Sequence, residues 1–292
     1  MILATILSWA VVTLSSSFMR QSADYESPLE NQMLMGALVE TFESDRYWVK
    51  VKAEDYTGWV TDLGLKVLTD EEKDAYLEAP KWICTVAYTS IREAPSASAP
   101  QLTDFTMGNL VRQTGNSKCC WVEVLLPDGR RGWVRKNCVK DFRDFALGAA
   151  PTRENITELA KQFLGTPYMW GGNSAKHFDC SGLVKLCYFM NGLLLPRNAS
   201  QQFRCGEPVA DGKWQPGDLL FFGKTDPVRV SHVAIYLGDG KIIHSSHLVR
   251  INTLEEYGRE PVGAVRIIGN EGKGAVAVKD SPYYFRQDGG KE

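Results

Sequence analysis

The residues with the clearest capacity for chemistry are one cysteine and two histidines, Cys180, His232 and His244. Asp179 and Cys180 stand directly before a run of apolar residues with helical spacing, so Asp179 is expected to cap the helix and Cys180 to begin it. Unsatisfied backbone N–H groups and a partial positive charge at a helix N-terminus favour the thiolate form of cysteine. Because the thiolate is a nucleophile, the sequence predicts nucleophilic chemistry at Cys180.

The two histidines belong to a stretch that alternates side chains as a β-hairpin does. Gly238-Asp239-Gly240 supplies the turn. With these three residues as the loop, His244 pairs opposite Ala234 and projects from the same face as His232, one step diagonal to it. This arrangement predicts that His232 exchanges the thiol proton and that His244 orients the imidazole of His232.

Two other interpretations of these residues stay open. Cys180, His232 and His244 could ligate zinc, although the spacings that normally anchor zinc, Cys-x-x-Cys and His-x-x-x-His, are absent. The histidines could also be ordinary core residues. The other six cysteines are expected to be small buried hydrophobic residues, and the odd total of seven leaves at least one thiol free, metal-bound or intermolecular.

The elements that must position these residues form an α+β domain in the second half of the chain. A helical spacing of apolar residues over 156–163 is stopped by Gly165, a second helix begins at Cys180, and strands follow from Asp218 onward. The tail after Ile268 is Gly-rich and charged, but its aromatic residues at 283–285 indicate that it packs against the protein.

The first half is an internal repeat. Trp48-Val49-Lys50-Val51 and Gly58-Trp59-Val60 recur, at a nearly constant offset, as Trp121-Val122-Glu123-Val124 and Gly132-Trp133-Val134. In each copy, apolar and polar residues alternate over short segments that are separated by polar turns. This pattern predicts short strands that form a small closed barrel. The charged segment 69–80 between the copies begins with a helix-start signal and is expected to form a helical linker.

Composition narrows the class of protein. The chain has 292 residues, 44% of them hydrophobic and 23% charged, as in a globular protein of two or three domains. Because 33 Lys and Arg nearly balance 35 Asp and Glu, for a formal net charge of −2, no nucleic-acid partner is expected. Residues 1–12 are apolar but lack the preceding cation of a signal peptide and are too short for a membrane span, so we expect a buried first strand.

Five motifs, in order, resemble the NlpC/p60 family of papain-like cysteine peptidases. They are GTPYMWGG at 165–172, FDCSGLV at 178–184, LPR at 195–197, WQPGDLLFF at 214–222 and HVAIYLG at 232–238. The Arg-x-x-Pro, central Gly and Gly-Trp-Val of the repeat resemble the bacterial SH3-like domain. The resemblance implies an α+β fold in which a papain-like catalytic domain is preceded by two small all-β SH3-like barrels.

The expected domains follow this order along the chain. They are a first SH3-like domain at 9–68, a linker at 69–80, a second SH3-like domain at 81–142, the peptidase domain at 150–268 and a tail at 269–292.

The resemblance also implies a function. Cys180, His232 and His244 would form a Cys–His–His triad that acts on cell-wall peptides, with Tyr168 lining the catalytic centre and supporting the oxyanion. The match is to members with two SH3-like domains, which cleave between γ-D-glutamate and a diamino acid in peptides with a free N-terminal L-Ala and release L-Ala-γ-D-Glu.

In those members an acid and a tyrosine of the first SH3-like domain hold the substrate amine, which implies substrate binding by Glu30 and Tyr56. Asp179 is expected to join them as a further anionic partner, because a buried ammonium needs such pairing, and Ser181 is also expected to bind the substrate. One departure is Pro196-Arg197-Asn198-Ala199-Ser200, where the family often shows Pro-Arg-Asp-Ser. The choice between diaminopimelate and lysine therefore stays open.

Two alternatives remain at this stage: an endopeptidase on intact peptidoglycan that uses the SH3-like domains as wall anchors, and a non-catalytic cell-wall-binding protein. No metal or organic cofactor is implied. The expected partners are peptidoglycan-derived peptides, and a monomer is favoured. The working compartment would be the cell envelope, or the cytoplasm if the protein recycles muropeptides.

Overall fold

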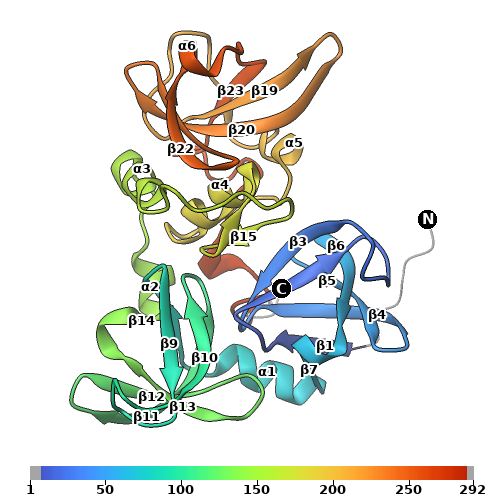
Figure 1. Ribbon diagram of the computed structural model, residues 1–292, viewed down its shortest axis with the longest axis vertical. Helices are drawn as coiled ribbons and strands as arrows, with labels where there is room; N and C mark the ends of the chain where they lie inside the picture. The colour runs from blue at the N-terminus through green and yellow to red at the C-terminus, as the bar shows by residue number, and fades with distance from the viewer. Residues whose placement is uncertain (1–7, 288–292) are drawn as a thin grey trace, which may run out of the picture. The chain divides into compact units, whose positions relative to one another are not determined.

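The computed structural model describes residues 8–287, in two compact units (Figure 1). Among the described residues, the first unit joins 8–147 with 279–287, and the second consists of 148–278. Residues 1–7, part of the expected first strand, lie outside the described residues. The remainder of that strand is present as β1 (Ser8–Val12), and its Ala10 and Val12 are buried as expected.

Each copy of the repeat folds into a seven-stranded antiparallel sheet, and the two sheets share one strand order. The orders are β3-β2-β6-β5-β4-β1-β7 and β10-β9-β13-β12-β11-β8-β14. The first sheet contains β1, β2 (Ser16–Arg20), β3 (Leu29–Leu34), β4 (Leu38–Asp45), β5 (Trp48–Ala53), β6 (Tyr56–Thr61) and β7 (Leu65–Leu68). The second contains β8 (Lys81–Cys84), β9 (Tyr88–Arg92), β10 (Gln101–Thr106), β11 (Leu110–Lys118), β12 (Trp121–Leu125), β13 (Arg131–Arg135) and β14 (Val139–Asp141). The repeat read from the sequence is thus a repeat of topology.

Strand β5 shows how the sequence pattern builds the first barrel. Val49 and Val51 alternate onto one face and pack in the core. Trp48 points the other way but is only 4% exposed, because the ring of Tyr25 covers it at a centroid distance of 4.9 Å. The alternation is therefore confirmed, and on the outer face Trp48 is covered while Lys50 and Lys52 are partly exposed.

The linker forms the expected helix, α1 (Asp70–Glu78), and holds the two sheets together. Thr69 caps it: its hydroxyl accepts from the backbone N–H of Glu72, and the Glu72 carboxylate accepts from the backbone N–H of Thr69. Tyr76 donates from this helix to the carbonyl of Gly36 at 2.7 Å. At Gly36, a Cβ atom would lie 2.5 Å from the carbonyl oxygen of Leu110, so the two barrels meet where only glycine fits.

The end of the chain returns to the first unit and packs there, as its aromatic residues indicate. Tyr283 donates to the carboxylate of Glu40, and Tyr284 donates to Glu54 at 2.9 Å. Phe285 stacks on Phe142 at a centroid distance of 5.1 Å.

The second unit has the expected α+β composition. Its six-stranded sheet has the order β18-β23-β19-β20-β21-β22. These strands are β18 (Glu207–Pro208), β19 (Leu219–Thr225), β20 (Val228–Gly238), β21 (Lys241–Ser246), β22 (Leu248–Thr253) and β23 (Gly263–Arg266). Two small pairs are β15 (Asn173–Ser174) with β16 (His177–Phe178), and β17 (Leu193–Leu194) with β24 (Val276–Ala277). Its helices are α3 (Arg153–Lys161), α4 (Cys180–Phe189), α5 (Ala199–Gln202) and α6 (Leu254–Tyr257). The preceding helix, α2 (Phe142–Gly148), belongs to the first unit except for its last residue.

Helix α4 is the central element of this unit because every one of its residues is buried. A helix that is buried on all sides must lie in the core of its domain.

No helix within residues 8–287 is both long enough and apolar enough to span a bilayer. The predicted domain boundaries at 9–68, 81–142 and 150–268 stay a prediction.

The cysteines follow the expectation only in part. All seven are free, and five of them are buried. Cys119 and Cys120 are instead exposed, because they form the turn between β11 and β12, where Cys119 adopts a φ of 52°. The expectation that every cysteine besides Cys180 is buried was wrong for this pair.

Candidate active site

Asp179 and Cys180 occupy the positions expected at the start of α4. The Asp179 carboxylate accepts from the backbone N–H of Gly182 at 2.8 Å, and Cys180 is the first helical residue. The backbone of Gly172 lies against this first turn. A Cβ atom at Gly182 would fall 1.9 Å from the carbonyl oxygen of Gly172, so the residue two places after Cys180 must be glycine.

The two histidines are in direct contact. Their hairpin, β20 with β21, pairs Ile235 with Ile243, the register expected from the sequence. The turn is tighter than the expected three-residue loop: Gly238 is still paired, and only Asp239 and Gly240 form the loop, with φ of 50° and 70°. His232 Nε2 lies 2.7 Å from His244 Nδ1. The two side chains thus project from the same face of the hairpin, diagonal to each other, as expected.

A third residue, Asn252, extends this chain of hydrogen bonds. It was not among the site residues predicted from the sequence. Its Oδ1 lies 3.1 Å from Nε2 of His244, and its side chain is also hydrogen-bonded to Glu256. Because a carboxylate only accepts, the amide nitrogen of Asn252 faces Glu256 and its oxygen faces His244. Asn252 lies on β22, which pairs with β21, so only knowledge of the third strand's register could have identified it.

These bonds fix the tautomers. His244 must donate from Nε2 to Asn252, so its Nδ1 is an acceptor. His232 then donates from Nε2 to His244 and keeps a bare Nδ1. An imidazole in this state can take a proton at Nδ1.

Cys180 lies beside the strand that carries His232. Hydrogen bonds from the backbone N–H groups of Val233 and Ser181 favour its thiolate, as does the charge of Arg197. Burial opposes them and is the largest effect, and together with the charge of Asp179 it raises the pKa of Cys180 to about 11. The expected preference for a thiolate at the helix N-terminus is therefore outweighed by burial.

His232 is shifted in the complementary direction. Burial lowers its pKa to about 3, and the nearby His244, Arg259 and Arg250 add to the effect. The resting site consequently holds a neutral thiol beside a neutral imidazole.

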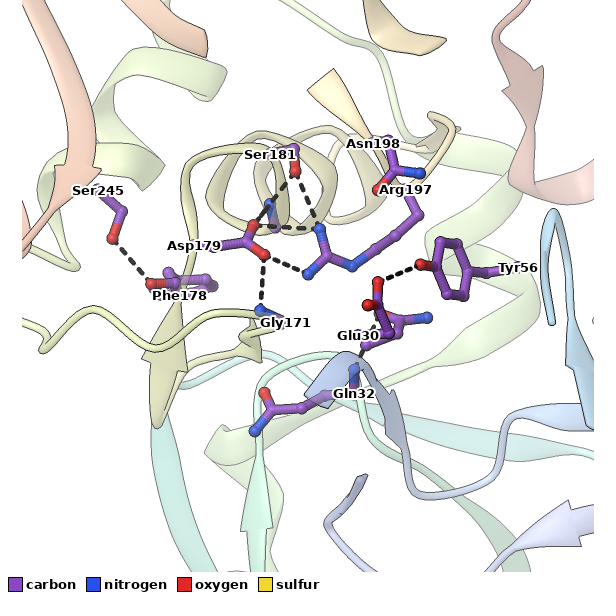
Figure 2. Close-up of polar contacts among 12 residues, drawn as sticks. Glu30, Gln32, Tyr56, Gly171, Phe178, Asp179, Ser181, Arg197, Asn198 and Ser245 are labelled. Carbon is purple, nitrogen blue, oxygen red and sulfur yellow. Dashed lines mark hydrogen bonds and ion pairs between the residues drawn. The ribbon is translucent and has the colours of Figure 1, made fainter. Parts of the chain in front are cut away.

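Arg197, also missed in the sequence as a site residue, organises the residues on either side of Cys180. It is 1% exposed and forms a bidentate ion pair with Asp179, one contact of which measures 3.1 Å. The same guanidinium donates to the hydroxyl of Ser181 at 2.9 Å (Figure 2). Asp179 also accepts from the backbone N–H of Gly171, so its negative charge is largely satisfied within the protein.

Tyr168 lies close to the same group of charges. The pKa of its hydroxyl is raised to about 12, chiefly by burial and also by the charges of Cys180 and Asp179. The hydroxyl thus keeps its proton at neutral pH and is able to donate a hydrogen bond.

Comparison with known proteins assigns this domain to a family. The model of the NlpC/P60 family matches residues 165–263, the bacterial dipeptidyl-peptidase SH3 domain matches 19–65 and the bacterial SH3 domain matches 87–140. A γ-D-glutamyl-L-lysine dipeptidyl-peptidase from Bacillus cereus is 30% identical over 248 residues, which cover 78% of this chain and 73% of the relative. The chain belongs to the NlpC/P60 family.

Two further relatives agree with this assignment. Dipeptidyl-peptidase 6 of Lysinibacillus sphaericus is 26% identical over 85% of this chain and 92% of its own length. A crystal structure of an NlpC/P60 family protein from Bacillus cereus superposes with a TM-score of 0.80 at 26% identity, covering 89% of this chain and all of the other. As an NlpC/P60 protein with a free cysteine beside paired histidines, the chain is a cysteine peptidase.

The SH3-like residues singled out in the sequence lie together in the first barrel. Tyr56, at the start of β6, donates its hydroxyl to Oε2 of Glu30 on β3 at 2.6 Å (Figure 2). Both side chains are partly exposed. The pair is therefore a preformed acidic group held by a phenol.

The segment that departs from the usual NlpC/P60 pattern begins helix α5. The backbone N–H of Asn198 donates to Oε1 of Gln201 at 3.0 Å, Ala199 is buried and Ser200 is exposed.

Within residues 8–287 no three His, Cys, Asp or Glu side chains are grouped so that they could hold a metal ion. The facing ring nitrogens of His232 and His244 are bonded to each other, which is unlike two ligands converging on zinc.

Proposed function

We propose that this cysteine peptidase hydrolyses the bond between γ-D-glutamate and a diamino acid in cell-wall peptides with a free N-terminal L-Ala, and releases L-Ala-γ-D-Glu. The observation that carries the chemistry is the 2.7 Å bond between His232 and His244 beside Cys180, which leaves one basic nitrogen for the thiol. The names of two relatives that each align with more than three quarters of this chain support the substrate and favour it over intact wall or a non-catalytic role.

In the proposed reaction the sulfur of Cys180 attacks the γ-carbonyl of D-Glu while its proton passes to Nδ1 of His232. The backbone N–H of Cys180 and the hydroxyl of Tyr168 donate to the oxyanion, each such donor being worth about 3 kcal/mol in comparable sites. His232 then protonates the amine of the diamino acid as the carbon–nitrogen bond breaks. Water, deprotonated by His232, hydrolyses the thioester and restores the thiol, and these steps use no metal or organic cofactor.

Specificity for a free N-terminus is proposed to come from Glu30 and Tyr56. A carboxylate already held by a phenol is a suitable partner for an ammonium. Asp179 and Ser181 are proposed to line the substrate site next to Cys180. Because Arg197 offsets the charge of Asp179, Glu30 is assigned the larger share of the ammonium. We further propose that the protein acts as a monomer without a nucleic-acid partner.

The test is hydrolysis of L-Ala-γ-D-Glu-diamino acid tripeptides, with products identified by mass spectrometry. Cys180→Ala should lower kcat by at least about a thousandfold, because loss of a nucleophile removes the covalent route. Cys120→Ala, which removes an exposed thiol, is the matched control and should leave turnover unchanged. Turnover of Cys180→Ala within about tenfold of wild type would contradict the nucleophile assignment.

A further inference from the structure

A polar pocket of about 440 Å³ lies beside the triad and has no role in the mechanism above. His232, Asn252 and Tyr257 line it, together with Arg250, Arg259 and Glu256. The pocket thus contains two guanidinium groups and one carboxylate, all within the second unit.

The sheet itself directs Arg250 into this region. Arg250 on β22 is the direct cross-strand neighbour of His244, so both project from the same face of the sheet. Asn252 is two residues further along the strand and shares that face. Helix α6 and the residue after its cap supply Glu256, Tyr257 and Arg259.

Two guanidinium groups line the pocket, and at least one of them has unused hydrogen-bonding capacity. The Nε atom of Arg250 is buried, and within residues 8–287 it has no hydrogen-bond partner. Arg259 is exposed, and its guanidinium carbon lies 5.9 Å from the ring centroid of Tyr257. In the described part of the chain neither arginine forms an ion pair, although a buried unsatisfied guanidinium nitrogen is costly.

The position of the pocket identifies which part of the substrate it meets. His232 delivers its proton to the amine that leaves, so that nitrogen must come within hydrogen-bond reach of the imidazole. The amine belongs to the diamino acid. The side chain and carboxyl groups of this residue therefore extend into the space that His232 lines.

We infer that Arg250 and Arg259 bind a carboxylate of the leaving diamino acid, which makes this pocket a specificity site for the third residue of the peptide. This inference rests on the proposed function. Two carboxylates can fill the role: the α-carboxylate, present in lysine and diaminopimelate tripeptides alike, and the distal carboxylate, present only with diaminopimelate. Glu256 offers a partner for the distal ammonium that both diamino acids carry.

The test compares four tripeptides that begin with L-Ala-γ-D-Glu. They end in meso-diaminopimelate, diaminopimelate amidated at the distal carboxyl, lysine, and lysine amide. Each is assayed with wild type, Arg250→Gln and Arg259→Gln. Arg229→Gln, which alters an exposed arginine outside the pocket, is the control and should behave as wild type. Arg259 is exposed, so its variant should fold even if Arg250→Gln does not.

The arginine variants should lose about tenfold to a hundredfold in kcat/KM on a carboxylate substrate, the worth of a charge-assisted hydrogen bond, and much less on the matching amide. If the variants lose more activity on the acid than on the amide only for the two diaminopimelate peptides, Arg250 and Arg259 bind the distal carboxylate. If the same difference appears between lysine and lysine amide, they bind the α-carboxylate. Losses that are equal for carboxylate and amide substrates, or no loss at all, would overturn the inference.

A binding arm separates this inference from the proposed function. The same four peptides are titrated calorimetrically into Cys180→Ala, alone and combined with Arg259→Gln. If wild type cleaves none of them, the proposed function fails. The pocket is still tested by the titration. A peptide with the carboxylate should bind at least about tenfold more tightly than its amide to Cys180→Ala, and this difference should disappear when Arg259→Gln is added. Equal affinity for acid and amide would contradict it.

Discussion

Arg197 is the side chain on which the residues flanking Cys180 depend. It is buried, it pairs with Asp179 and it holds Ser181. The LPR motif marks Arg197 in the sequence, but its partner could not be predicted, because the two residues lie on opposite sides of helix α4 and β17 in the chain, 18 residues apart, and meet only in the folded core. The same reason applies to the pKa of Cys180: the helix start was predictable, and the burial that outweighs it was not.

Replacing Arg197 should therefore destabilise the second unit. Arg197→Leu leaves the buried carboxylate of Asp179 without its cation, a change that typically costs about 3 to 5 kcal/mol. Urea denaturation followed by circular dichroism would measure the free energy of unfolding. Arg229→Leu, at an exposed arginine of the same unit, should change it by less than about 0.5 kcal/mol. A loss below about 1 kcal/mol for Arg197→Leu would show that the pair is not a structural support.

The raised pKa of Cys180 has a measurable consequence. A thiol with a pKa of about 11 is protonated throughout the neutral range, so its reactive thiolate fraction increases about tenfold for each pH unit. Alkylation of Cys180 by iodoacetamide, followed by peptide mass spectrometry, should accelerate in this way from pH 6 to pH 9. The Cys119→Ser/Cys120→Ser variant removes the exposed thiols from the assay. A rate that is constant over this range would instead mean that the thiolate is already formed at pH 6.

At the scale of elements, much of the architecture was predictable because each signal was local. The capping residue Thr69, the cap at Asp179 and the period-two pattern around His232 each depend on neighbours in sequence. The hairpin was decisive, since its register alone brings His232 and His244 together. Asn252 and Arg250 escaped prediction because they depend on how a third strand pairs with that hairpin.

The C-terminal segment is the element with the least expected role. Tyr283 and Tyr284 donate to carboxylates of the first barrel and Phe285 stacks on Phe142. A chain ending after residue 278 loses these contacts, so we expect its first unit to lose about 2 to 4 kcal/mol of stability, somewhat less than the typical effect of deleting fully buried aromatic side chains, because these three are partly exposed.

Tryptophan fluorescence during urea unfolding would measure this loss, since Trp9 packs edge-on to Tyr283. A chain ending after residue 287 keeps the segment and serves as the control. The segment would be dispensable if the two chains unfolded at the same urea concentration.

At the scale of the whole molecule, the proposal assigns one task to each unit. The first carries the Glu30 and Tyr56 pair, and the second carries the triad. The near-zero net charge of the chain agrees with local recognition of one small zwitterionic peptide rather than with attraction to a polyanion. The proposed binding of the amine by its first copy gives the duplicated barrel a task other than wall anchoring.

The central claim is that the enzyme requires a free substrate amine. The direct measurement compares kcat/KM for L-Ala-γ-D-Glu-diaminopimelate with that for its N-acetylated form, using wild type, Glu30→Gln and the surface control Glu43→Gln. The acetylated peptide cannot form the charge-assisted ion pair with Glu30, so kcat/KM should be about tenfold to a hundredfold higher for the free peptide in wild type and in Glu43→Gln. Glu30→Gln should remove most of that preference. Equal cleavage of the free and acetylated peptides by the wild-type enzyme would contradict the account.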